Sequence, residues 1–278
     1  MHPDNDNFIA REAPGPAPKG GFAVVIVAAV IVVVLIAAAL AASKLAASPS
    51  RRAVDDPPPT TISEPTLDPQ PTTLGSGFES TIAITIVDSL KVFESPDESS
   101  AVKVELPRQN EHGVDQVFLV KESRDAWLRV LLPIRPNGTT GWVRIRDLKI
   151  TGTNYRLRVH VGEKKIELLE RGKLVTQFPT AIGKQNTPTP GGEYYLKELL
   201  KPKKQNGPYG SYAYGLSGFS NVLESFNGGA GVIGIHGTND PSSIGKEVSA
   251  GCIRMKNEDI EQLVGILPLG TPVEILAD

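Results

Sequence analysis

The amino-acid sequence predicts a mainly β protein that follows one long apolar segment. Short runs of alternating apolar and polar residues recur after Phe78, and this is the period of half-buried strands. Glycine (27 residues) and proline (23 residues) are each more frequent than aromatic residues, as in chains with many turns. Beyond the apolar segment, only residues 257–267 repeat apolar side chains at helical spacing.

The first 77 residues divide into three segments. Residues 1–20 are polar and rich in proline and glycine, and we expect an irregular cytoplasmic tail. Residues 21–43 carry no charge, and about 20 apolar residues are enough to cross a membrane, so they predict a single N-terminal transmembrane helix. A cleavable signal peptide is the alternative, although its apolar region is usually only about 7–15 residues long. Residues 44–77 are rich in proline, serine and threonine and predict an extended linker.

Residues 78–150 predict a small antiparallel β-barrel. Alternating runs are separated by the turn signals Ser95-Pro96-Asp97 and Pro136-Asn137-Gly138. The motif Gly141-Trp142-Val143 resembles the closing strand of bacterial SH3-like domains, and this resemblance implies an SH3-like fold. In such domains an aromatic side chain can contact wall peptide, but we expect Trp127 and Trp142 to lie in the core.

Residues 151–278 predict a second β domain with one helix. Strand-like runs cover residues 155–161, 165–169 and 173–180, and a final strand is expected at 271–276. Asn257 is a suitable N-cap for the helix, and Asp259 lies in its first turn, where the helix dipole favours anions. We therefore interpret Asp259 as a dipole partner rather than a catalytic acid.

Cys252 is the only cysteine in the chain, which excludes an internal disulfide. An imidazole can take the proton of a thiol and hold the thiolate as an ion pair, so Cys252 and His236 form a candidate acyl-transfer couple, and we expect His236 to lower the pKa of the thiol. Gly251 lets its own amide and that of Cys252 turn toward an oxyanion beside the sulfur. The alternative is a buried structural cysteine with an unrelated histidine.

Composition and spacing argue against several other functions. The formal net charge of -2 gives no electrostatic case for binding nucleic acid. One cysteine and four scattered histidines offer no local spacing of metal ligands, so no metal site is expected. No glycine-rich phosphate loop lies between a strand and a helix, and no cofactor is expected.

Two separate segments carry a family resemblance. His236-Gly237-Thr238, followed by residues 249–255 with the sequence SAGCIRM, resembles the HG and SxGC[IV]R[ML] signature of YkuD-type L,D-transpeptidases. Residues 187–195, TPTPGGEYY, resemble the TPxGxF segment of the same family. Ala250 stands where many members have histidine. The resemblance implies a YkuD-like β-sandwich with one helix in residues 151–278.

The resemblance also implies roles for the residues of the signature. Cys252 would be the nucleophile and His236 the base, oriented by the main-chain carbonyl of Gly237. Ser249 would line the site and bind substrate, or its hydroxyl would cap a loop amide. Arg254 would bind a substrate carboxylate, or it would brace the loop.

The function implied is peptidoglycan L,D-transpeptidation, in which stem peptides are joined by 3→3 cross-links through a cysteine thioester. Carbapenem-type inhibitors are expected to acylate such an enzyme. The alternatives are an L,D-carboxypeptidase and a non-catalytic wall-binding anchor. Because the substrate lies outside the cell, we expect a single-pass protein of the cell membrane with its catalytic domain facing the wall, although basic residues flank residues 21–43 on both sides. A basic cluster at residues 197–204 would draw in substrate carboxylates or form a solvated loop face.

Overall fold

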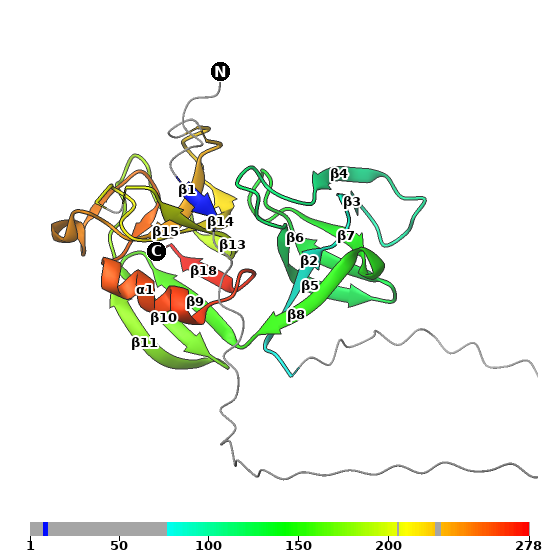
Figure 1. The fold of residues 1–278 in the computed structure, drawn as a ribbon, viewed down its shortest axis with the longest axis horizontal. Coiled ribbons are helices and arrows are strands. Elements are labelled where there is room, and N and C mark those ends of the chain that lie inside the picture. The colour runs from blue at the N-terminus through cyan, green and yellow to red at the C-terminus, as the bar shows by residue number, and fades with distance from the viewer. Residues whose placement is uncertain (1–7, 11–76, 205, 226–228, 278) are drawn as a thin grey trace, which may run out of the picture. The chain divides into compact units, whose positions relative to one another are not determined.

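The computed structural model describes residues 8–10, 77–204, 206–225 and 229–277. These residues form a seven-stranded sheet, a nine-stranded sheet and a separate pair of short strands (Figure 1). One α-helix, α1 (Asn257–Ile266), is present in the described part of the chain. The prediction of a mainly β fold with a single helix in its C-terminal part is therefore confirmed for the described residues.

The seven-stranded sheet is antiparallel throughout. Its order is β4 (Val102–Pro107), β3 (Ser89–Phe93), β7 (Thr140–Arg144), β6 (Trp127–Leu131), β5 (Val117–Arg124), β2 (Ser80–Thr85) and β8 (Leu148–Thr153), and the 3₁₀ turn η2 (Ile145–Asp147) joins β7 to β8. Alternate apolar side chains, among them Leu90, Phe118 and Leu128, fill one core. Trp127 and Trp142 pack with Phe93 in a neighbouring cluster and are buried, as the sequence predicts.

The nine-stranded sheet carries the candidate site. Its order is β11 (Lys173–Pro179), β10 (Lys165–Glu170), β9 (Tyr155–His160), β18 (Pro272–Leu276), β13 (Gly192–Pro202), β14 (Ala213–Phe219), β15 (Val232–His236) and β17 (Ile253–Arg254), and β1 (Phe8–Ala10) also pairs with β13. The pairs β15–β17 and β18–β9 are parallel. Helix α1 buries Ile260, Leu263 and Val264 in the core of this sheet. The short strands β12 (Ile182–Gly183) and β16 (Glu247–Ser249) pair beside it, and η3 (Pro241–Ser243) precedes β16.

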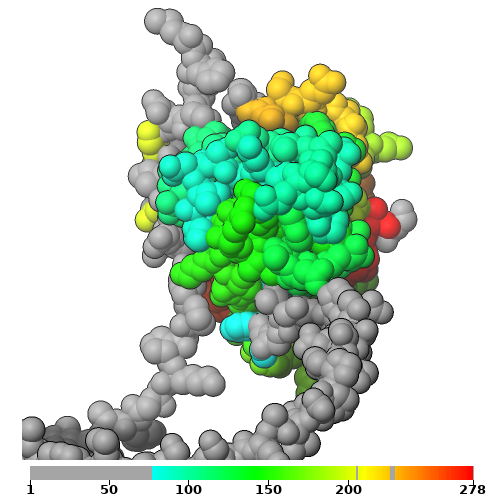
Figure 2. All heavy atoms as spheres, turned by 90° about the vertical axis from the view of Figure 1, so that its right-hand side faces the viewer, coloured from blue at the N-terminus to red at the C-terminus, as the bar shows by residue number. Residues whose placement is uncertain are grey.

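The two sheets share apolar and polar contacts within one compact unit. Tyr195 of β13 packs in a cluster with Ile82 and Leu131 of the seven-stranded sheet. The Arg135 guanidinium donates to the Ser220 carbonyl at 2.9 Å. Figure 2 shows atoms coloured yellow to orange at the top of the view, next to the cyan and green atoms of the seven-stranded part. The first sheet therefore supports the segment that follows β14.

The prediction that the protein is anchored in the cell membrane by a single span is contradicted. The described part of the chain has no helix with the length and apolar character that crossing a membrane requires. The predicted span, residues 21–43, and most of the predicted linker, residues 44–77, lie outside the described residues. Residues 8–10, predicted as cytoplasmic tail, form β1 against β13. A single span between these two strands would put them on opposite sides of a membrane.

Candidate functional site

Two neighbouring parallel strands bring Cys252 and His236 together. β15 ends at His236, β17 begins directly after Cys252, and Ile235 lies opposite Ile253 in the register. Ile235 and Ile253 point into the core, so the alternation of side chains places Gly234, His236 and Cys252 on the other face. A hydrogen bond from the Gly234 amide reaches the Cys252 sulfur. The sulfur and the imidazole thus lie on adjacent strands and on one face of the sheet.

His236 is buried and has a defined tautomer. Its Nδ1 lies 2.6 Å from the carbonyl oxygen of Gly237, and since a carbonyl only accepts, Nδ1 carries the hydrogen and Nε2 keeps a free lone pair. The Tyr209 ring meets the imidazole edge-on, with 5.0 Å between the ring centroids. The pKa of His236 is lowered to about 4, mainly by burial and also by the positive charge of Arg254. The hydrogen bond to the Gly237 carbonyl acts in the opposite direction and raises this pKa. The imidazole is therefore neutral at pH 7 and can act as a base.

Cys252 is half-buried, and its pKa differs from the sequence expectation. Burial raises the pKa of the thiol, although the Gly234 hydrogen bond and the charge of Arg254 oppose this rise. The prediction that His236 lowers the pKa of Cys252 is therefore wrong, because the loss of water outweighs the nearby favourable groups. At neutral pH the site holds a thiol beside a neutral imidazole.

Ser249 and Gly251 form a braced turn in front of the cysteine. The Ser249 hydroxyl donates to the Cys252 carbonyl at 2.6 Å and accepts from the Gly251 amide at 3.1 Å. Ser249 is only 1% exposed, so its hydroxyl stabilises the turn and is not open to substrate, in agreement with the capping alternative. The Gly251 amide, one of the two predicted oxyanion donors, is therefore already engaged. Gly251 has φ of 117°, a conformation that favours glycine.

The second motif of the sequence, residues 187–195, holds this turn in place. The Thr187 hydroxyl donates to the Ser249 carbonyl at 3.1 Å, and the Thr189 hydroxyl donates to the Gly251 carbonyl at 3.0 Å. Thr189 also accepts from the Gly183 amide at 2.9 Å. Sequence analysis assigned no role to these threonines, although their position in a motif could have indicated one.

Asn257 fixes the loop that follows His236. Its Oδ1 accepts from the amides of Thr238 at 3.1 Å and Ser211 at 3.2 Å. A Cβ atom at Gly237 or Gly210 would lie 2.2 or 2.1 Å from this oxygen, so both positions require glycine. The prediction of Asn257 as N-cap is wrong, because α1 begins at Asn257 itself and the amide group serves the two loops instead.

Arg254 supports the candidate site through its backbone hydrogen bonds and through the positive charge of its side chain. Its amide and carbonyl bond to Ala181 at 2.8 and 2.9 Å, which braces β17. Its side chain is half-buried, and Nε has no hydrogen-bond partner in the described part of the chain. Arg254 lies opposite His236 in the register of β15 and β17, and its charge lowers the pKa of both His236 and Cys252. Both predicted uses of Arg254, bracing and carboxylate binding, are compatible with this position.

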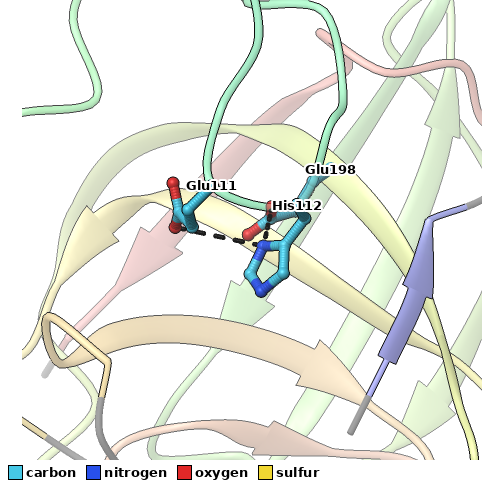
Figure 3. Close-up of side chains that lie close together, drawn as sticks. All are labelled: Glu111, His112 and Glu198. Carbon is cyan, nitrogen blue, oxygen red and sulfur yellow. Dashed lines mark hydrogen bonds and ion pairs between the residues drawn. The ribbon is translucent and has the colours of Figure 1, made fainter. Parts of the chain in front are cut away.

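A separate polar cluster joins the two sheets. Within the described residues, Glu111, His112 and Glu198 place potential metal ligands within 4.8 Å of one another (Figure 3). The Lys197 ammonium lies 3.3 Å from Glu198 and 3.4 Å from Glu111, so it pairs with both carboxylates. The cluster therefore forms an ion-pair network that includes Lys197. Lys197 is only 9% exposed and does not form part of a solvated basic face.

Comparison with known proteins places residues 154–275 in a family model described as the L,D-transpeptidase catalytic domain, YkuD. YkuD of Bacillus licheniformis, named as an L,D-transpeptidase, is 42% identical over 121 residues, which are 44% of this chain and 65% of that protein. YqjB of Bacillus subtilis, also named as an L,D-transpeptidase, is 35% identical over 130 residues, 43% of this chain and 70% of that protein. The solved structure of LdtMt1 in complex with imipenem is 16% identical, with a TM-score of 0.35 over 70% of this chain and 82% of that chain. The chain thus spans about two thirds of the length of these two relatives.

Proposed function

The chain belongs to the L,D-transpeptidase family, and from this premise we propose that it forms 3→3 cross-links between peptidoglycan stem peptides through a thioester at Cys252. One observation carries the proposal. His236, whose Nδ1–H is held by the Gly237 carbonyl, lies on the same face as Cys252, with its Nε2 lone pair free. This is the arrangement that a thiol nucleophile and a general base require.

The first half of the reaction transfers an acyl group to sulfur. The thiol attacks the carbonyl that follows the third residue of a donor tetrapeptide while its proton passes to Nε2 of His236. The Cys252 amide donates to the oxyanion of the tetrahedral intermediate. The imidazolium then returns the proton to the amine of the terminal D-alanine, which leaves, and a thioester remains.

The second half transfers the acyl group to an amine. A side-chain amine of another stem peptide attacks the thioester carbonyl, and His236 accepts the proton that this amine loses. The carbon–sulfur bond breaks, the proton returns to sulfur, and the new amide is the cross-link. The guanidinium of Arg254, whose side chain is half-buried, would bind a substrate carboxylate during both halves.

We also propose the division of the chain that accompanies this function. Residues 78–150 would be an SH3-like domain, supported by the antiparallel sheet and by the motif Gly141-Trp142-Val143 on β7. Residues 151–278 would be the catalytic domain, and the family match from residue 154 supports this boundary. A thiol nucleophile of this kind should also be acylated by carbapenems at Cys252 and at no other residue.

Product analysis with the full chain tests the proposed reaction. The protein is incubated with a disaccharide tetrapeptide, and the products are identified by mass. A cross-linked dimer with release of D-alanine supports a transpeptidase, whereas the tripeptide alone indicates an L,D-carboxypeptidase. Turnover that persists in Cys252→Ala would refute the role of the cysteine in either reaction.

A further inference from the structure

His112 and Glu198 form a partly buried contact between the two sheets (Figure 3). His112 lies in the loop between β4 and β5, and Glu198 lies in β13. The Nδ1 atom of His112 is 2.8 Å from Oε2 of Glu198, and the Asn110 side-chain amide donates to the same oxygen at 2.7 Å. Glu198 is only 3% exposed. Its carboxylate is therefore fixed by a loop of the other sheet.

The charges around this contact keep Glu198 ionised. Burial alone would raise the pKa of Glu198, but the hydrogen bonds and charges of His112 and Lys197 lower it below its ordinary value. The hydrogen bond to Glu198 raises the pKa of His112, and the negative charge of Glu111 also raises it. Burial lowers this pKa but is outweighed. Lys197, Glu111 and Glu198 are thus the charged groups that face His112. The contact is thus a hydrogen-bonded anchor in which Glu198 lowers the free energy of protonated His112 and His112 favours ionised Glu198.

A row of residues leads across the sheet from Glu198 to the candidate nucleophile. Glu198 pairs with Gly215 of β14, and Gly215 pairs with Gly234 of β15. Gly234 and Cys252 each come one residue before the paired Ile235 and Ile253, and the backbone hydrogen bond of Gly234 lowers the pKa of the Cys252 thiol. Neighbouring strands lie about 4.8 Å apart, so three strand spacings put Glu198 about 14 Å from β17. Residues next to Glu198, Gly215 and Gly234 in the chain, such as Leu199, Tyr214 and Ile235, point into the core. The row therefore lies on the opposite face of the sheet, which carries the site.

The two glycines make this row tightly packed. A Cβ atom at Gly215 would lie 2.3 Å from Oε1 of Glu198, so the carboxylate rests directly on the backbone of β14. A Cβ atom at Gly234 would lie 2.7 Å from the carbonyl oxygen of Tyr214, so β14 in turn rests on β15. No side chain at either glycine is available to absorb a shift. A displacement of Glu198 should therefore move the Gly234 amide relative to the sulfur.

We propose that Glu198 is a positioning residue for the Cys252 sulfur and that His112, from the other sheet, holds Glu198 in place. Through Gly215 and Gly234, the pair sets the hydrogen bond that the sulfur receives. The inference rests on the proposed role of Cys252 as nucleophile. It gives the seven-stranded sheet a part in the reactivity of the site.

The test uses the full chain and the alkylation of Cys252 by iodoacetamide between pH 6 and pH 10. Because Cys252 is the only cysteine, the rate reports on one sulfur. The variants are Glu198→Gln, His112→Gln and their combination. The matched control is Glu167→Gln, since Glu167 lies in β10 of the same sheet and pairs with His160 at 3.1 Å outside the row. Circular dichroism establishes that each variant is folded over the pH range.

The Gly234 hydrogen bond lowers the pKa of the thiol, so losing it should move the rate profile to higher pH. We expect Glu198→Gln and His112→Gln each to slow alkylation at pH 8 by about 3- to 10-fold, which is about half to one pKa unit. The double variant should be no slower than the slower single variant, because both changes act on one contact. Glu167→Gln should keep the wild-type profile.

Two results would overturn the proposal. One is that the profiles of Glu198→Gln and His112→Gln coincide with that of the wild type, and the other is that Glu167→Gln shifts the profile equally. If Glu198→Gln does not fold, His112→Gln decides, because His112 lies in a loop and is only half-buried. Alkylation of Cys252 needs no peptidoglycan substrate. If the wild type formed no product from the disaccharide tetrapeptide, the proposed function would be refuted, but the alkylation profiles of the variants would still test the positioning role.

Discussion

The buried histidine predicts a specific loss of stability in acid. His236 is 5% exposed, and its pKa is about 4 in the folded chain against an ordinary value of 6.5. As the pH falls below 6.5 the unfolded chain binds a proton that the folded chain does not bind until about pH 4. The difference of about 2.5 pKa units, at about 1.36 kcal/mol per unit, corresponds to about 3.4 kcal/mol. This part of the free energy of unfolding is fully present above pH 6.5 and is lost as the pH falls from 6.5 to 4.

Equilibrium urea unfolding of the wild type and His236→Asn, followed by circular dichroism between pH 7 and pH 4, measures this contribution. Asparagine does not titrate, so the variant should lose about 3 kcal/mol less of its free energy of unfolding over this range than the wild type does. Acidic groups such as Glu198 also weaken the fold in acid, but they do so in both proteins and cancel in the comparison. Equal slopes of stability against pH in the two proteins would refute the argument that His236 is buried as a neutral base.

Three further outcomes are expected. Asn257→Ala leaves the amides of Thr238 and Ser211 without an acceptor and should cost about 2–3 kcal/mol in urea unfolding, whereas Asn257→Asp keeps the oxygen and most of the stability; equal stability of the two variants would contradict this role. Cys252 should react with iodoacetamide at pH 7.5 more slowly than free cysteine, because burial raises its pKa, and a faster reaction would be inconsistent with a neutral thiol. Arg254→Met should slow this alkylation further by raising the pKa of Cys252, and Arg254→Lys should restore most of the rate; an unchanged rate in Arg254→Met would show that the guanidinium does not act on the sulfur.

Strands with one buried face could be predicted from the sequence. Strands in the centre of the sheet, which are buried on both faces, could not. The alternating runs between residues 78 and 180 mark strands with one covered face. Residues 197–231 contain little periodicity and are typical of a long loop, yet β13 extends to Pro202 and β14 covers Ala213–Phe219. Every residue of β14 is buried, because this central strand is covered on both faces and therefore does not alternate.

The candidate pair Cys252 and His236 could be identified from the sequence, but the residues that support it could not. Cys252 and His236 stand in a motif, and a motif can be recognised without knowing the fold. Asn257 and Thr189 act through hydrogen bonds to residues far away in the chain, and such contacts leave no local pattern. The cluster of Glu111, His112 and Glu198 was missed for the same reason, since more than 80 residues separate His112 from Glu198.

The charge state of the pair depends on burial, and the magnitudes show which effect dominates. The pKa of Cys252 lies above its ordinary value of 9.0 and that of His236 is about 4, so moving the proton from sulfur to nitrogen costs at least about 5 pKa units, or about 7 kcal/mol. The attraction between a thiolate and an imidazolium even at about 4 Å returns only about 4 kcal/mol at an effective dielectric constant of about 20. The neutral pair is therefore favoured by about 3 kcal/mol, and the proton must move as the sulfur attacks. In the proposed reaction His236 therefore takes the proton only as the sulfur attacks. The hydrogen bond from Gly234 makes this transfer easier, whereas the charge of Arg254 favours the thiolate and disfavours the imidazolium.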